Sequence, residues 1–163
     1  MKENENFKIR RAVEADIPLL LHFIQELAEY EKLSDIVEAD ENVLRDSMFG
    51  EDSNTKALLA FFEGEPVGFA IYFFNFSSFL GRMGLYLEDL YVNPKMRGKG
   101  FGKALLKRLA QIALEKKCGR MEWVVLDWNE PAIEFYNRLG AEALGDWTTF
   151  RLNEKEIETL ASN

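Results

Sequence analysis

Asn93-Pro94-Lys95-Met96-Arg97-Gly98-Lys99-Gly100-Phe101-Gly102-Lys103 joins two segments of different periodicity. Before it, residues 85–91 alternate in the manner of a β-strand. One face would carry Leu87, Asp89 and Tyr91, and the other Tyr86, Glu88 and Leu90. After it, apolar residues recur at helical spacing, at Leu105, Leu106, Leu109, Ile112 and Ala113. Since Pro94 has no N–H for a ladder, the stretch predicts a strand, a glycine-rich turn and a helix.

Residues 97–103, here called the glycine loop, should bind an anion. A turn before a helix exposes backbone N–H groups, and glycines allow a ligand to approach them closely. A P-loop would need Ser or Thr after Lys103, where this chain has Ala104. A Rossmann turn would need a different glycine interval. Taken alone, the loop is equally compatible with an ordinary glycine turn before a buried helix.

Length and composition indicate one globular domain spanning residues 1–163. The chain has 47% hydrophobic residues and a net charge of −8. No apolar run reaches the length of a membrane span, and residues 1–6 do not resemble a signal peptide, so we expect a cytoplasmic protein. The acidic balance argues against nucleic acid and is compatible with cationic substrates. Cys118 and His22 are each the sole residue of their type and have no metal-ligand or catalytic spacing around them.

The rest of the chain predicts a mixed sheet flanked by helices. Strands are expected at 7–10, 56–62, 67–76, 85–91, 121–127 and within 143–152. Helices are expected at 16–32, 40–49, from the glycine loop to about 117, 129–139 and 154–160. A strand–helix–strand unit around the glycine loop requires a parallel pair, whereas the hairpin at 63–66 requires antiparallel strands. The fold class is therefore α/β with a central mixed sheet.

Four motifs in register resemble one enzyme family. Arg97-x-x-Gly100-x-Gly102 is similar to the pyrophosphate loop of the GNAT N-acetyltransferases. The segments 26–31 (Glu-Leu-Ala-x-Tyr-Glu), 86–89 (Tyr-Leu-Glu-Asp) and 127–136 (Asp-Trp-Asn-Glu-Pro-x-Ile-x-Phe-Tyr) narrow the resemblance to the diamine acetyltransferases, which include the spermidine/spermine and thialysine enzymes. The expected element order matches the GNAT fold over nearly the whole chain.

The resemblance implies a set of site residues. The acetyl-CoA contacts would be Leu90, Tyr91, Val92, Arg97, Gly98, Lys99, Gly100, Phe101, Gly102, Lys103, Asn129, Pro131 and Ala132. The acceptor amine would contact Tyr30, Glu31, Glu88, Glu122, Trp123 and Val124. Glu88 and Tyr136 would be catalytic, and no metal is implied. A homodimer is also implied, and the aromatic-rich stretch 72–79 would need cover.

The chemistry of amine acetylation fits these roles. An aliphatic amine, with a pKa of about 10.4, must lose a proton before it attacks a thioester, and a carboxylate such as Glu88 can accept that proton. The thiolate leaving group needs a proton, which a phenol such as Tyr136 can donate. Backbone N–H groups of 90–92 would stabilise charge on the carbonyl oxygen if a bulge freed them. Glu88 and Tyr136 each have a plainer interpretation, as an exposed strand carboxylate and as a core tyrosine. Asp89 would point to the opposite face from Glu88 and is expected to serve structure.

The sequence does not identify which amine accepts the acetyl group. Ser78 lies where the spermidine enzymes carry an aspartate, and the thialysine-preferring enzymes also have serine there, so a short amine is favoured over a long polyamine. The alternatives are a protein lysine or N-terminal acetyltransferase and a non-catalytic acetyl-CoA-binding protein. The presence of both Glu88 and Tyr136 argues against the non-catalytic alternative.

Overall fold

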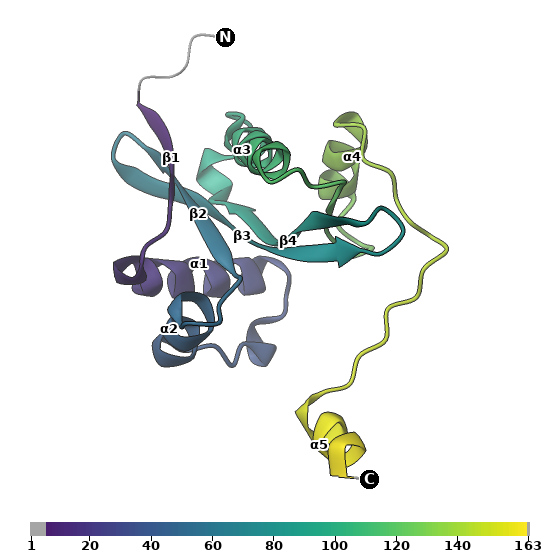
Figure 1. The fold of residues 1–163 in the computed structure, drawn as a ribbon. Coiled ribbons are helices and arrows are strands. Elements are labelled where there is room, and N and C mark those ends of the chain that lie inside the picture. The colour runs from purple at the N-terminus through teal and green to yellow at the C-terminus, as the bar shows by residue number, and fades with distance from the viewer. Residues whose placement is uncertain (1–5, 163) are drawn as a thin grey trace. The chain divides into compact units, whose positions relative to one another are not determined.

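The computed structural model describes residues 6–162 and divides into two compact units, one ending at Val124 and the other beginning at Val125. The first unit holds the sheet, the glycine loop and three helices (Figure 1). Each unit is described by itself below. Within residues 6–162, no helix is long and apolar enough to span a bilayer.

Five strands form one sheet in sequential order: β1 (Phe7–Arg11), β2 (Lys56–Phe62), β3 (Glu65–Ser77), β4 (Arg82–Val92) and β5 (Met121–Glu122). The first four pair antiparallel. β5 pairs parallel to β4, with Leu85 opposite Met121 and Tyr86 opposite Glu122. The predicted mixed sheet is therefore confirmed. The β2–β3 turn holds Glu63 at φ 53° and Gly64 at φ 86°, the backbone twist that a two-residue hairpin loop requires.

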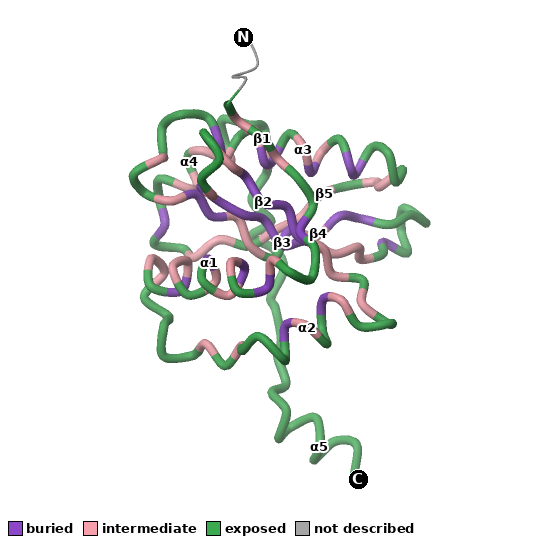
Figure 2. The backbone as a smooth tube through the Cα atoms, turned by 90° about the vertical axis from the view of Figure 1, so that its left-hand side faces the viewer, coloured by how far each residue is buried: buried purple, intermediate pink, exposed green. Residues whose placement is uncertain are grey.

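Helices cover both faces of this sheet. α1 (Ile17–Tyr30) and α2 (Glu41–Phe49) lie on one face and α3 (Phe101–Glu115) on the other (Figure 1). Short 3-10 turns occur at Glu14–Asp16, Ser34–Ile36 and Pro94–Met96. Burial is concentrated on the strands and on the inward sides of the helices (Figure 2). The core under α1 includes Ile17, Leu20, Phe23, Leu59, Phe69, Ile71 and Tyr91.

β4 contains a bulge that corrects the predicted side-chain alternation. Ile71 of β3 pairs with Asp89, and the next residue, Tyr72, pairs with Leu87, so Glu88 has no partner of its own. Ile71 belongs to the core under α1, whereas Tyr72 lies near Arg108 and Glu115 of α3. Directly paired residues share a face. Leu87 and Asp89 consequently lie on opposite faces of the sheet, although strict alternation predicts the same face.

Two predicted strands are wrong. The strand expected at 121–127 ends at Glu122, because the bulge at Glu88 bends β4 and breaks the parallel register beyond Tyr86. The second unit contains α4 (Glu130–Arg138) and α5 (Glu154–Ser162), and residues 143–152 form no strand. A strand needs a neighbour for its backbone groups, and residues 125–162 offer none.

Candidate active site

The glycine loop combines bare backbone donors with a helix start. Gly100 occupies the N-cap position of α3 at φ 86°, a left-handed conformation that favours glycine. The helix has no side-chain cap. Within the described residues, the N–H groups of 98–103 have no backbone acceptor, whereas the next one, Ala104, donates to Gly100. These donors and the positive end of the helix dipole meet at one point, which suits a phosphate.

Gly102 keeps space open at that point. A Cβ placed there would meet only Val92 Cγ2, at 3.8 Å, which is an ordinary contact. The protein itself therefore does not require glycine at this position. A ligand that approaches the backbone closely would explain why residue 102 has no side chain. Lys95, Arg97, Lys99 and Lys103 are exposed around the loop and add positive charge to an otherwise acidic chain.

The Arg97 side chain folds back onto the end of β4. Its Nε donates to the Val92 carbonyl at 3.0 Å. Its guanidinium lies 4.3 Å from the centre of the Tyr30 ring and 5.6 Å from that of Tyr91. The loop is thus joined to both β4 and α1.

β4 has an open edge next to the loop. Its pairing with β5 stops at Tyr86, so the β5-side backbone groups of residues 87–92 have no neighbouring strand among residues 6–124. Alternate N–H groups along this segment point to that edge. The expected roles of the Leu90, Tyr91 and Val92 amides stay predictions, and an open edge of this kind is what they require.

Three carboxylates gather on the α1 side of the sheet, and we call Glu31, Glu88 and Asp89 the acidic face. Burial, followed by the charges of Glu88 and Glu31, raises the pKa of Asp89 to about 7. Burial also raises the pKa of Glu31, which directly follows α1. The pKa of Tyr86 is raised by burial and then by Glu88 and Glu122. The charge of Glu88 thus acts on both Asp89 and Tyr86.

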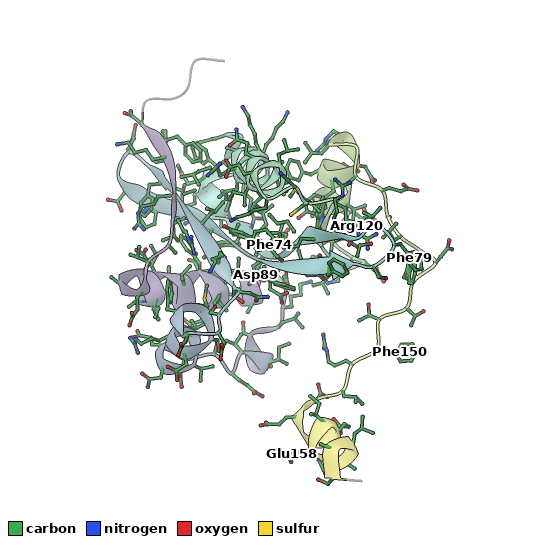
Figure 3. All side chains as sticks on the ribbon, in the orientation of Figure 1. Phe74, Phe79, Asp89, Arg120, Phe150 and Glu158 are labelled. Carbon is green, nitrogen blue, oxygen red and sulfur yellow. The ribbon has the colours of Figure 1, made fainter. Side chains whose placement is uncertain are left out.

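Asp89 lines a pocket of about 300 Å³ beneath the sheet. In Figure 3 it lies between the sheet and α1. The other lining residues are Ile24, Leu27, Ala28, Glu31, Leu33, Ile36, Val37, Glu38 and Ala39. An apolar wall with carboxylates at one end suits an aliphatic chain that carries a positive charge. The sequence predicts a structural role for Asp89, because strict alternation puts it on the opposite face from Glu88; the bulge instead leaves Asp89 on the opposite face from Leu87.

The other residues predicted to bind the acceptor lie at the end of β5 and do not form a cluster like the acidic face. Glu122 is in an ion pair with Arg120, whose Nε lies 2.8 Å from Glu122 Oε1. Trp123 is half-buried, and the Val124 side chain is 74% exposed. The structure thus brings Glu31, Glu88 and Asp89 together, with Glu122 near Tyr86 but already paired.

The second unit carries the other predicted residues. Tyr136 is half-buried on α4, with its ring 5.5 Å from that of Phe135. Asn129 is only 8% exposed, and its side-chain Oδ1 is buried without a hydrogen-bond partner. Asn129 occupies the N-cap position of α4, and its side chain makes no capping hydrogen bond there. Pro131 and Ala132 lie in the first turn of α4.

Across residues 6–162, no cluster of three or more His, Cys, Asp or Glu side chains could hold a metal ion. The first unit presents two features of opposite charge, the glycine loop and the acidic face.

Comparison with known proteins gives consistent matches. Residues 21–141 match the Acetyltransferase (GNAT) family. A thialysine N-epsilon-acetyltransferase from Bos taurus is 42% identical over 164 residues, covering 94% of this chain and 96% of that protein. A spermidine/spermine N(1)-acetyltransferase-like protein from Homo sapiens is 37% identical and covers 95% of this chain and 24% of its own. A solved integron cassette protein from V. cholerae has a TM-score of 0.81 at 28% identity, covering 98% of this chain and all of that one.

Proposed function

The chain belongs to the GNAT family of acetyltransferases, and from this premise we propose that it moves the acetyl group of acetyl-CoA to the primary amine of a small cationic acceptor. The acceptor is thialysine-like or a diamine. Residues 1–163 would form one such domain, which the match over 21–141 supports. The names of both relatives refer to small amines, and the acidic face has the matching charge.

One observation carries the proposal: the bulge at Glu88 leaves Glu88 and Asp89 close together on a sheet that also presents the glycine loop. A buried carboxylate attracts an ammonium group strongly, because little water screens the pair. Asp89 and Glu31 would hold the distal positive group of the acceptor. Glu88, which is exposed, would receive the proton from the reacting amine.

The coenzyme would bind with its pyrophosphate on the N–H groups of 98–103. The unpaired donors and the open space at Gly102 support this assignment. The coenzyme contact expected from Asn129 rests on the sequence resemblance. Acetyl-CoA supplies the acyl group as its thioester.

The reaction would be a direct transfer. The ammonium group of the acceptor first loses a proton to Glu88, directly or through a water molecule. The neutral nitrogen then attacks the acetyl carbon, the carbon–sulfur bond breaks, and the nitrogen releases its second proton as the amide forms. Open N–H groups at the edge of β4 would stabilise the negative charge on the carbonyl oxygen. The departing thiolate would take a proton from Tyr136. The role of Tyr136 rests on the sequence resemblance.

The experiment that tests the function compares kcat/KM of the unmodified protein for thialysine, lysine, putrescine, spermidine and spermine. We expect a short amine to be best, because each additional ammonium group of a polyamine needs its own anionic partner. Ser78, at the β3–β4 turn, is not such a partner. Spermine as the best acceptor would refute the preference for short amines. No activity on any of the five would favour a protein acetyltransferase.

We also infer a homodimer. Large apolar side chains are exposed at the tip of the β3–β4 hairpin, namely Phe76, Phe79, Leu80 and Met83. In the second unit, Trp147 is 78% and Phe150 is 92% exposed (Figure 3). Exposed apolar side chains in such number indicate a surface that another protein chain covers. A monomer in light scattering at assay concentration would contradict this. A cytoplasmic location without nucleic-acid or membrane partners remains a prediction from composition and charge.

A further inference from the structure

Arg97 connects the glycine loop to a helix that carries acceptor residues. Its Nε is used by the Val92 carbonyl. The planar guanidinium then lies against the Tyr30 ring, 4.3 Å from its centre. Tyr30 is the last residue of α1, and the next residue, Glu31, belongs to the acidic face. A single turn of chain therefore reaches both regions.

A second contact holds the same corner together. Tyr91 is 5% exposed and lies 5.6 Å from the Arg97 guanidinium. Burial, together with the charge and a hydrogen bond of Glu26 on α1, raises the pKa of its phenol to about 12. Tyr91 is thus neutral and fixed. Arg97 lies over two aromatic rings, one from α1 and one from β4.

The contacts of Arg97 matter because the rest of the glycine loop has few interactions that fix its conformation. Gly98 and Gly100 both have positive φ, and the start of α3 has no side-chain cap. Glycines lose more conformational freedom on ordering than other residues do. A loop held at its first residue has less freedom to lose when an anion binds, which raises affinity.

We propose that Tyr30 is a positioning residue for the coenzyme, acting through Arg97 on the glycine loop. This inference rests on the proposed function, since it takes acetyl-CoA as the ligand of the loop. It differs from the acceptor-binding role that the sequence resemblance implies for Tyr30. The phenol ring face, rather than its hydroxyl, carries the effect, because a guanidinium is attracted by the ring's π electrons.

The test measures acetyl-CoA affinity by calorimetry, without any acceptor present. Tyr30→Leu removes the ring and should weaken binding roughly fivefold, in line with a partly desolvated cation–π contact. Tyr30→Phe keeps the ring and serves as the matched control, so its affinity should stay within about twofold of the unmodified protein. With saturating acetyl-CoA, Tyr30→Phe should also leave the amine KM nearly unchanged.

A double-mutant cycle shows whether Tyr30 acts through Arg97. Arg97→Gln should weaken binding on its own, and Tyr30→Leu should add little when combined with it. Arg97→Lys keeps the positive charge but loses the planar group that stacks on the Tyr30 ring, so it should also weaken acetyl-CoA binding. This variant tests the contact without any change in α1. Thermal unfolding checks that every variant is folded.

Two results would overturn the inference. One is unchanged acetyl-CoA affinity in Tyr30→Leu while the amine KM rises, which would return Tyr30 to the acceptor site. The other is full additivity in the cycle, which would separate Tyr30 from Arg97. Absence of acetyl-CoA binding in the unmodified protein is a different outcome, since it would refute the proposed function and the inference with it.

Discussion

The glycine loop and the acidic face lie on the same sheet and are built in opposite ways. The loop presents backbone N–H groups, and its shape follows from the φ angles of Gly98 and Gly100. The acidic face presents side chains, and its composition depends on a single bulge at Glu88. Backbone recognition suits a ligand part that never varies, such as a pyrophosphate. Side-chain recognition can be altered residue by residue, which suits the acceptor.

The end of α1 contacts both regions. Tyr30 lies against Arg97 of the loop, and Glu31 lines the pocket with Asp89. Variants that affect one region and leave the other intact therefore test whether the two are truly separate.

Gly102→Val should have the largest effect and should be confined to the coenzyme. A Cβ at this position meets only Val92 Cγ2, at 3.8 Å, so the fold should persist. The new side chain would occupy the space next to the open donors. Loss of two hydrogen bonds to a charged group, at about 1.5–3 kcal/mol each, would weaken acetyl-CoA by roughly a hundredfold or more. Calorimetry with acetyl-CoA measures this directly.

Gln111→Val is the matched control, because it puts the same side chain on an exposed position of the same helix. It should leave the acetyl-CoA affinity unchanged. If both variants bind as tightly as the unmodified protein, the pyrophosphate does not lie on the glycine loop.

Tyr136→Phe should affect neither binding region and still lower turnover. Loss of a general acid typically costs about a hundredfold or more in kcat. Acetyl-CoA affinity and amine KM should change little, since the ring remains. Steady-state kinetics over a range of both substrates separates these quantities. Near-normal kcat would make Tyr136 a packing residue beside Phe135.

The sequence predicts the structure of the glycine loop better than that of the acidic face. Glycine spacing before a periodic helix is a local signal, and it correctly placed the loop, β4 and α3. The bulge has no local signal, because it depends on how β3 pairs with β4 around Ile71 and Tyr72. Strict alternation therefore put Asp89 on the same face as Leu87, which is wrong. Residues 143–152 have strand-like composition but form no strand, since pairing depends on a neighbour and not on propensity.

Asp89→Asn should have the smallest effect and the most informative pH dependence. The ionised carboxylate attracts the acceptor, and its pKa is about 7. At pH 8 the substitution should raise the amine KM by roughly tenfold, since a hydrogen bond to a charged group is worth about 1.5–3 kcal/mol. At pH 5.5 Asp89 is already protonated, so the variant and the unmodified protein should converge. Taking their ratio cancels ionisation of the acceptor itself.

Glu88→Gln is the control for this pH dependence, because it removes the neighbouring carboxylate, which is exposed. It should lower kcat at every pH and leave acetyl-CoA affinity unchanged. The amine KM of this variant should still depend on pH, with a lower midpoint, because one of the two charges that raise the pKa of Asp89 is gone. A flat KM profile in Glu88→Gln together with a normal one in Asp89→Asn would exchange the two assigned roles.

Stability gives a readout that needs no substrate. The pKa of Asp89 is higher in the folded protein than its ordinary value of 3.8. The folded state therefore holds this proton more tightly, and Asp89 lowers the free energy of unfolding as pH rises from about 4 to about 7. Removing the charge should raise the unfolding temperature of Asp89→Asn at pH 8 by roughly 5 °C. That difference should shrink towards pH 4. An equal unfolding temperature at pH 8 would mean that Asp89 is solvated, and the pocket would then offer no low-dielectric site for an ammonium group.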